Sequence, residues 1–165
     1  MNVKKIYNVL FICTGNSARS VLAEGLMNQL GAERFHAYSA GSHPKGAVNP
    51  LALQELQALH IPTDGLRSKA WDEFAGPQAP AMDFIFTVCD QAAGEVCPFW
   101  PGQPATAHWG LADPAAAEGS NETKARAFHE AALILKRRIE LMLDLPLDRL
   151  DALTIHRQIK DIGRR

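Results

Sequence analysis

The sequence contains few cysteines, no long apolar run and almost no net charge. Its 165 residues include three cysteines, Cys13, Cys89 and Cys97, which are too few and odd in number for a secreted disulfide framework. No C-x-x-C pair is present, which argues against a zinc ribbon. The 17 basic and 18 acidic residues give a formal net charge of −1, which provides no general attraction to nucleic acid or to an anionic membrane. Any anion site must therefore be local.

Long hydrophobic segments are also missing. No run approaches the roughly 18 apolar residues that a membrane span needs. The apolar stretch at 7–13 is short and leads into Gly15-Asn16-Ser17 without a small-residue cleavage site, so it predicts a strand rather than a signal peptide. We therefore expect a cytoplasmic protein with reduced thiols, and neither a membrane nor a nucleic acid as its partner. The 47% hydrophobic and 21% charged content, at this length, suits one globular domain.

Apolar runs alternate with amphipathic segments along the chain. The run at 7–13 is almost continuously apolar, which is typical of a strand covered on both faces in a parallel sheet. Turn residues and helical spacing predict strands at 36–40, 83–89 and 105–109, and helices at 21–30, 51–59, 122–143 and beyond Pro146. This alternation predicts an α/β fold, a single domain with a four-stranded parallel sheet and helices on both faces.

The segment between the first strand and the first helix has the form C-x5-R followed by a hydroxyl residue. Ligands of parallel α/β sheets bind where strands end and helices begin, and Cys13 has that position. A tight loop there turns successive N–H groups toward a tetrahedral oxyanion, while the helix dipole and Arg19 supply positive charge. The same field favours a thiolate at Cys13, assisted by a hydrogen bond from Ser20. A buried cysteine and a surface arginine that match C-x5-R by chance are the alternative. The predicted oxyanion site consists of Thr14, Gly15, Asn16, Ser17, Ala18 and Arg19.

Asp113-Pro114 follows the last predicted strand. A loop aspartate there would reach over the anion and protonate a leaving oxygen, because an adjacent anion favours the protonated carboxyl. Asp-Pro is also an ordinary turn sequence, and taken alone Asp113 fits that plainer interpretation.

The two remaining cysteines lie close together in the sequence. Cys89 ends the strand predicted at 83–89, so its sulfur would lie at the same sheet edge as that of Cys13. Residues 90–96, rich in Ala and Gly, separate it from Cys97, and such a loop allows the two sulfurs to meet as a disulfide. Two small hydrophobic residues are the other interpretation.

One ordered set of motifs extends over nearly the whole chain. It comprises the loop at 13–20, Ser39-Ala40-Gly41, the cysteine at 89, and His108-Trp109-Gly110 with Asp113-Pro114. Together these motifs resemble the arsenate reductases built on the low-molecular-weight protein tyrosine phosphatase fold. The resemblance runs from about residue 7 to about residue 143. It implies a phosphatase-like domain at 1–145 and a C-terminal helical extension at 146–165.

The resemblance implies a role for each candidate residue. Cys13 is the expected nucleophile, and Arg19 with the loop amides is expected to bind arsenate or phosphate. Ser20 is expected to support the thiolate, and Asp113 is the expected general acid. No metal and no bound cofactor is implied.

The reductases of this family add a thiol relay. In their cycle Cys13 attacks arsenate, Cys89 attacks Cys13 to release arsenite, and Cys97 takes over the disulfide for an external thiol reductant. This sequence departs from the thioredoxin-coupled members in two ways. The gap between Cys89 and Cys97 is one residue longer, and Lys69 stands where some of them place an acidic residue near a potassium site. A lysine ammonium in place of the ion, and glutathione with glutaredoxin in place of thioredoxin, are therefore open alternatives.

Two other functions remain open. A phosphatase acting on phosphotyrosine or a small phosphomonoester would use the same nucleophile and acid, with the other two cysteines structural. A non-catalytic anion-binding or redox-sensor module is disfavoured, because binding alone needs neither a nucleophile nor an acid. Among the histidines, His108 lies nearest to the predicted site and is expected to have a structural role, whereas His43 is expected on the surface or with its hydrogen bonds satisfied.

Overall fold

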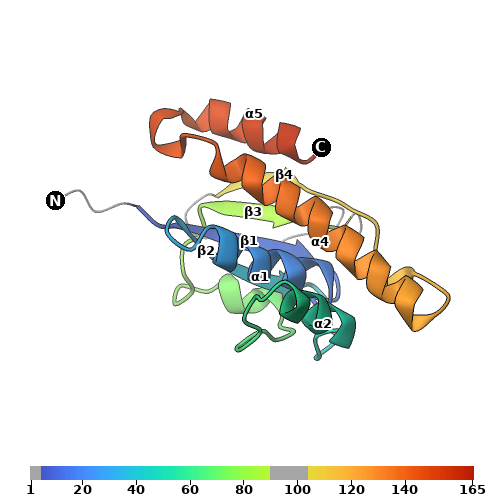
Figure 1. Ribbon diagram of the computed structural model, residues 1–165. Helices are drawn as coiled ribbons and strands as arrows, with labels where there is room; N and C mark the ends of the chain where they lie inside the picture. The colour runs from blue at the N-terminus through green and yellow to red at the C-terminus, as the bar shows by residue number, and fades with distance from the viewer. Residues whose placement is uncertain (1–4, 90–103) are drawn as a thin grey trace.

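The computed structural model describes residues 5–89 and 104–165 (Figure 1). Strands and helices alternate along the chain, as the apolar pattern predicts. The elements in order are β1 (Tyr7–Cys13), α1 (Arg19–Leu30), β2 (Phe35–Gly41), α2 (Pro50–Ala58), the 3-10 helix η1 (Trp71–Phe74), β3 (Phe84–Thr87), β4 (Ala105–His108), η2 (Pro114–Ala116), α4 (Asn121–Leu143), η3 (Leu147–Arg149) and α5 (Ala152–Ile162).

The four strands form one parallel sheet in the order β2-β1-β3-β4. β1 lies inside the sheet, and its residues Val9, Leu10, Phe11 and Ile12 are fully buried, which explains its nearly continuous apolar sequence. All four strands point the same way, so the ends of β1, β2 and β3 meet at one edge of the sheet. This arrangement confirms the predicted α/β fold class.

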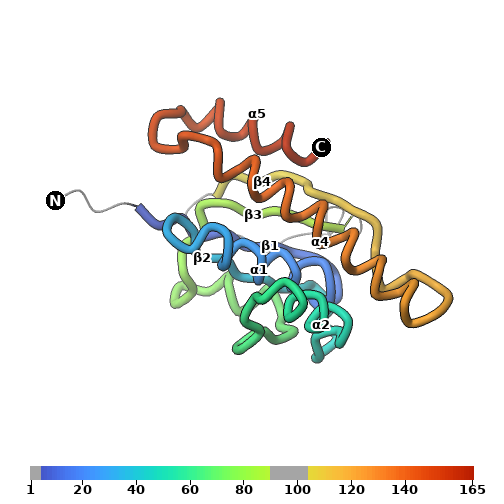
Figure 2. The backbone as a smooth tube through the Cα atoms, viewed as in Figure 1, coloured from blue at the N-terminus to red at the C-terminus, as the bar shows by residue number. Residues whose placement is uncertain are grey.

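Helical segments lie on both faces of the sheet. On one face the Ser39 hydroxyl of β2 donates to Glu24 of α1, and α4 packs against α1 in the same layer. Neighbouring strand residues point to opposite faces, and Tyr38 packs its ring 5.4 Å from that of Phe74 in η1. Figure 2 shows α1 and α4 in front of the sheet, with α2 on the same side.

The strand that leads to Cys89 is shorter than the sequence predicts. β3 ends at Thr87, which pairs with Ile12 of β1 and with His108 of β4. Val88 lies just beyond the strand and still donates its N–H to the Ile12 carbonyl of β1, at 2.9 Å. Cys89 follows in a bend, outside β3.

The C-terminal segment returns to the sheet edge after α4. Helix α5 packs against β4 and α4, and in Figures 1 and 2 it runs alongside both. Its inner residues Ile159 and Ile162 are buried. The helix predicted beyond Pro146 is therefore present, and it covers the edge strand of the sheet. In the part of the chain that the structure describes, no helix combines the length and apolar character that crossing a membrane requires.

Candidate active site

The loop between β1 and α1 curls around the Cys13 thiol. Cys13 is the last residue of β1, and α1 begins at Arg19 with no acidic side chain in its first turn. No side chain caps this helix end, so its N–H groups and its dipole are directed at the space beside Cys13. The loop fits tightly against β2, because a Cβ at Gly41 would overlap the carbonyl oxygen of Thr14. Only glycine is accommodated there.

Hydrogen bonds from outside the loop hold its carbonyl groups away from the thiol. The Thr14 and Gly15 carbonyls accept from the backbone N–H groups of His43 and Lys45, at 2.9 and 3.0 Å. The Ser17 carbonyl likewise accepts from Asn49 at 2.8 Å. In a trans peptide the N–H points opposite to the C=O, so the N–H groups that follow these carbonyls are turned to the other side. The loop is therefore lined with donors, as an oxyanion site requires.

The Ser20 hydroxyl lies 2.9 Å from the sulfur of Cys13. Ser20 is fully buried, and its oxygen also accepts a 2.7 Å hydrogen bond from the Asn16 side-chain amide. Because Asn16 supplies one proton to this oxygen, the hydroxyl proton of Ser20 is left to donate to Cys13. That direction stabilises a thiolate, as the sequence predicts for Ser20.

Asn16 is the centre of the network behind the loop. It is fully buried and has a left-handed backbone, with φ of 44°. Besides Ser20, its amide donates to the Ser39 hydroxyl at 3.0 Å, and its side-chain oxygen accepts from the Lys69 backbone N–H at 2.8 Å. Asn16 thus points away from the oxyanion side. Its side chain braces the loop, and Asn16 is missing from the residues that line the cavity, although the sequence predicted it in the oxyanion site.

The Lys69 ammonium lies beside this network. It is 3.4 Å from both Glu24 Oε1 and Ser39 Oγ and 3.1 Å from the Arg67 carbonyl, and Lys69 is 8% exposed. A buried charge is tolerated when it is paired, and Glu24 provides the pair. A potassium ion does not fit among these groups, because the lysine already places a positive charge between the same oxygens.

Arg19 and Asp113 lie side by side in the wall of the cavity. Asp113 Oδ2 is 3.7 Å from the Arg19 guanidinium, and its other oxygen accepts from the Ala115 N–H at 3.0 Å. Arg19 also donates to the Leu111 carbonyl at 2.8 Å. The Asp113 side chain is 41% exposed and that of Arg19 is 17% exposed. The two interpretations of Asp113, as a turn residue and as a general acid, are therefore compatible. One carboxylate oxygen caps η2, and the other faces the cavity.

Cys89 lies against the other side of the Cys13 loop. Its sulfur is 3.6 Å from the Thr14 hydroxyl, and both Cys13 and Cys89 are buried. The structure therefore brings together two of the three cysteines. Cys97 lies outside the described residues.

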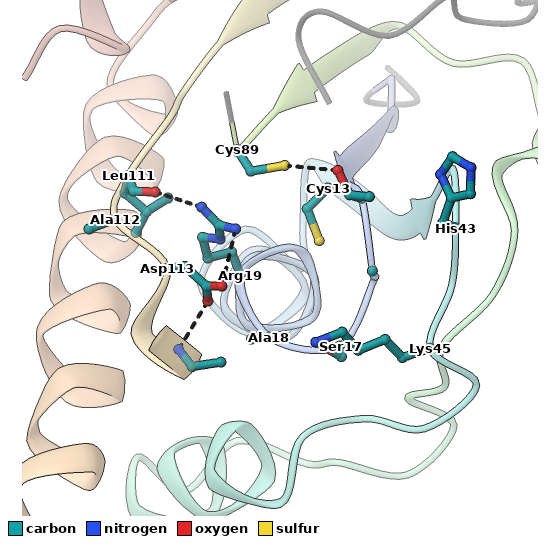
Figure 3. A pocket seen from close by; sticks show the side chains of 13 residues that line it. Cys13, Ser17, Ala18, Arg19, His43, Lys45, Cys89, Leu111, Ala112 and Asp113 are labelled. Carbon is teal, nitrogen blue, oxygen red and sulfur yellow. Dashed lines mark hydrogen bonds and ion pairs between the residues drawn. The ribbon is translucent and has the colours of Figure 1, made fainter. Parts of the chain in front are cut away.

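These groups line a single cavity of about 460 Å³ (Figure 3). Its wall combines thiol, backbone and charged groups: Cys13, Thr14, Gly15, Ser17, Ala18, Arg19, His43, Lys45, Cys89, Leu111, Ala112, Asp113 and Ala115. Figure 3 shows His43 and Lys45 on the side of Cys13 opposite to Arg19 and Asp113.

Two basic residues of this wall escape the sequence analysis. His43 and Lys45 follow β2, whose end lies beside that of β1. Because ligands bind where the strands of such a sheet end, this position in the sequence could have identified them. His108 was expected nearest to the site, but it is not in the wall and hydrogen-bonds to Thr87 at 2.8 Å. The described residues contain no group of three His, Cys, Asp or Glu side chains suited to a metal ion.

A model of the family "Low molecular weight phosphotyrosine protein phosphatase" matches residues 8–152. An arsenate reductase of Halalkalibacterium halodurans is 37% identical over 140 residues, which cover 85% of this chain and 95% of that protein. The chain belongs to the arsenate reductases of this family. The arsenate reductase of Bacillus subtilis is 36% identical over 116 residues, 70% of this chain and 80% of its own length.

A solved structure of an arsenate reductase in its phosphate-binding state is also similar. It has a TM-score of 0.67 and 26% identity, and it covers 82% of this chain and 95% of its own. The family match of residues 8–152 extends beyond residue 143, where the resemblance was expected to end. It ends at the first residue of α5, so most of this helix follows the matched region.

Proposed function

We propose that this arsenate reductase converts arsenate to arsenite with Cys13 as nucleophile, Asp113 as general acid and Cys89 as the thiol that releases the product. The observation that carries this proposal is the presence of Cys13, Cys89 and Arg19 in the wall of one cavity. Family membership supports the activity, and the related structure in a phosphate-binding state supports a tetrahedral oxyanion as the ligand.

The first step forms a bond between sulfur and arsenic. The arsenate lies in the loop, where the N–H groups and Arg19 balance its charge. The Cys13 thiolate attacks arsenic, and one As–O bond breaks. The Asp113 carboxyl gives a proton to the leaving oxygen, which departs as water. Ser20 donates to the sulfur before the attack and so favours the thiolate.

The second step is the reduction. The Cys89 thiolate attacks the Cys13 sulfur, and a Cys13–Cys89 disulfide forms. The electron pair of the S–As bond goes to arsenic, which leaves as arsenite in the +3 state. The two thiols have supplied the two electrons. The contact between Cys89 and Thr14 places Cys89 beside the loop that holds the adduct.

The relay to the external reductant completes the cycle. We assign Cys97 the attack on Cys89, which would free Cys13 and leave a Cys89–Cys97 disulfide. Thioredoxin, or glutathione with glutaredoxin, would then reduce that disulfide in a reducing cytoplasm. Assays with each reductant system in turn decide between them.

Cys89→Ser tests the relay directly. The reduced wild-type protein should form up to one arsenite per chain without any external reductant, together with a disulfide detectable by mass spectrometry. The variant should form neither, because it lacks the thiol that is assigned to attack Cys13. Cys97→Ser is the control: it should still release the first arsenite and retain the Cys13–Cys89 disulfide. A Cys89→Ser protein that reduces arsenate at the wild-type rate contradicts the relay.

Phosphomonoester hydrolysis is a second activity of the same site. The family model is that of a phosphotyrosine phosphatase, and the nucleophile, Arg19 and Asp113 suffice for a phosphocysteine cycle. Cys89→Ser should therefore leave the hydrolysis of p-nitrophenyl phosphate unchanged, because water rather than a second thiol attacks phosphocysteine. If wild type hydrolyses the ester but forms no arsenite, the phosphatase is the principal activity.

A further inference from the structure

Gly110 is the joint between β4 and the segment that carries Asp113. Glycine rotates more freely than any other residue, so the direction of the chain after Gly110 must be fixed by other groups. Two peptide groups flank its Cα, and their carbonyls belong to Trp109 and Gly110. Both carbonyls accept from one nitrogen, Nη1 of Arg138, at 2.7 and 3.0 Å. This pair of bonds fixes the two peptide planes relative to each other.

Arg138 is a charged residue that is buried and has one side-chain nitrogen without a hydrogen-bond partner among the described residues. It is 7% exposed, and burial lowers the pKa of its guanidinium. Its Nε finds no hydrogen-bond partner among the described residues. An uncompensated buried polar group costs stability, and a methionine would fill much of the same space without that cost. The hydrogen bonds to the Gly110 joint are therefore what the arginine contributes.

Helix α5 contacts the two residues before Gly110, Trp109 and His108. The Trp109 indole stacks on Phe86 with centroids 3.9 Å apart and donates from Nε1 to the Ile159 carbonyl at 2.9 Å. At the end of the helix, Gly163 lies so close to the His108 carbonyl that a Cβ would overlap it. The contacts from Ile159 and Gly163 come from the part of the chain that follows the family match, which ends at residue 152.

We propose that Arg138 is a positioning residue that fixes the Gly110 joint, with α5 as its support, and thereby holds Asp113 over the oxyanion. Asp113 lies three positions after Gly110 in the sequence. Between them, the Leu111 carbonyl accepts a hydrogen bond from Arg19, as Figure 3 shows. The proposal rests on the function of Asp113 proposed above. Arg138 does not line the cavity and acts through the loop.

The test is a double-mutant cycle of Arg138→Met and Asp113→Asn. The rate of single-turnover arsenite formation is measured without external reductant. Asp113→Asn should slow it roughly 10²–10⁴-fold, the contribution of a placed acid. Arg138→Met should slow it about 10–100-fold, because a misplacement near 1 Å costs on the order of 10². In the Asp113→Asn background the same change should cost less than about twofold, because no acid remains to be positioned.

Two further variants separate positioning from loss of structure. Arg137→Met makes the same chemical change at the exposed neighbour and should keep the wild-type rate. Arg138→Lys should recover part of the rate, because an ammonium also donates to carbonyls. With phosphate esters, Arg138→Met should slow phenyl phosphate more than p-nitrophenyl phosphate, since the poorer leaving group needs the acid more. Phosphate affinity should stay unchanged.

Trp109→Phe keeps the test decisive if Arg138→Met does not fold. It removes the bond to the Ile159 carbonyl, retains the ring stack and should show a milder form of the same pattern. An Arg138→Met protein with the wild-type rate, or with an equal loss in both Asp113 backgrounds, overturns the proposal. If Asp113→Asn alone keeps the wild-type rate, the acid role fails and Arg138 loses its target. If wild type forms no arsenite, the failure belongs to the proposed function.

Discussion

The Cys13 loop and the Asp113 segment meet at one cavity but are supported in opposite ways. Behind the loop, Asn16, Ser20 and Ser39 are fully buried, and the Asn16 side-chain amide donates to both hydroxyls. Asp113 is 41% exposed and is held by its own turn and by a long contact to Arg19. The loop is part of the core, whereas the acid belongs to the surface.

This difference separates the two demands of the chemistry. Binding and ionising the nucleophile require fixed dipoles, which a buried network provides without reorganisation. A proton donor has to exchange its proton with solvent between turnovers, which an exposed carboxyl allows. Damage to the loop should therefore lower both stability and activity, whereas damage to the Asp113 segment should lower activity with a smaller effect on stability.

The largest effect is expected from Cys13→Ser, which removes the nucleophile. The buried network behind the loop and the segment that carries Asp113 both stay in place. Arsenate reduction and ester hydrolysis should both be lost, because a serine hydroxyl is not ionised near neutral pH. Phosphate binding should survive, since the loop amides and Arg19 remain, and calorimetric titration measures it. Turnover at the wild-type rate in this variant would remove Cys13 from the mechanism.

Asn16→Ala breaks the loop's support without touching the cavity wall. Ser20 and Ser39 lose a donor, and the Lys69 N–H becomes a buried donor without an acceptor, which costs about 1–3 kcal/mol. Alanine also tolerates the left-handed backbone less well than asparagine. We expect a lower midpoint in urea, and slower alkylation of Cys13 at neutral pH, because the Ser20 proton is no longer directed to the sulfur.

Asn28→Ala is the matched control for that prediction. Asn28 also joins α1 to β2 by two hydrogen bonds, both to Ala37, but it lies at the far end of the helix from Cys13. It should lower stability and leave alkylation unchanged. If both variants slow alkylation equally, the effect follows from lost stability and not from the network behind Cys13.

The sequence predicts the parts of the site that are local along the chain. Cys13, Arg19 and Ser20 lie within eight residues, and their placement follows from a strand that turns into a helix. The supports escape prediction because they join distant segments. Asn16 and Lys69 are 53 positions apart, and no periodicity pairs them.

The strand ends show the same limit in another form. The apolar run before Cys89 continues to the cysteine, but β3 ends at Thr87, close to where its neighbour β1 ends. A strand's length depends on its partners as well as on its own residues. The buried Arg138 gave no signal at all, because in the sequence it is one of two consecutive arginines on a long helix.

The smallest effect is expected at the exposed ion pair between Arg67 and Glu73, which precedes the residues that bond to the Cys13 loop. Arg67 donates twice to Glu73, at 2.9 and 2.6 Å, just before Ser68 and Lys69, which bond to the loop. Both partners are largely exposed, so Glu73→Gln should cost less than about 1 kcal/mol at pH 7 and leave kcat/KM unchanged. The hydrogen bond from Arg67 lowers the pKa of Glu73 from its ordinary 4.5. Its stabilisation is therefore present above that value and is lost as pH falls through the lower folded pKa, so the urea midpoints of the two proteins should converge once the pH lies below that folded pKa. A fall in kcat/KM would mean that this surface pair, and not the buried network alone, holds the loop.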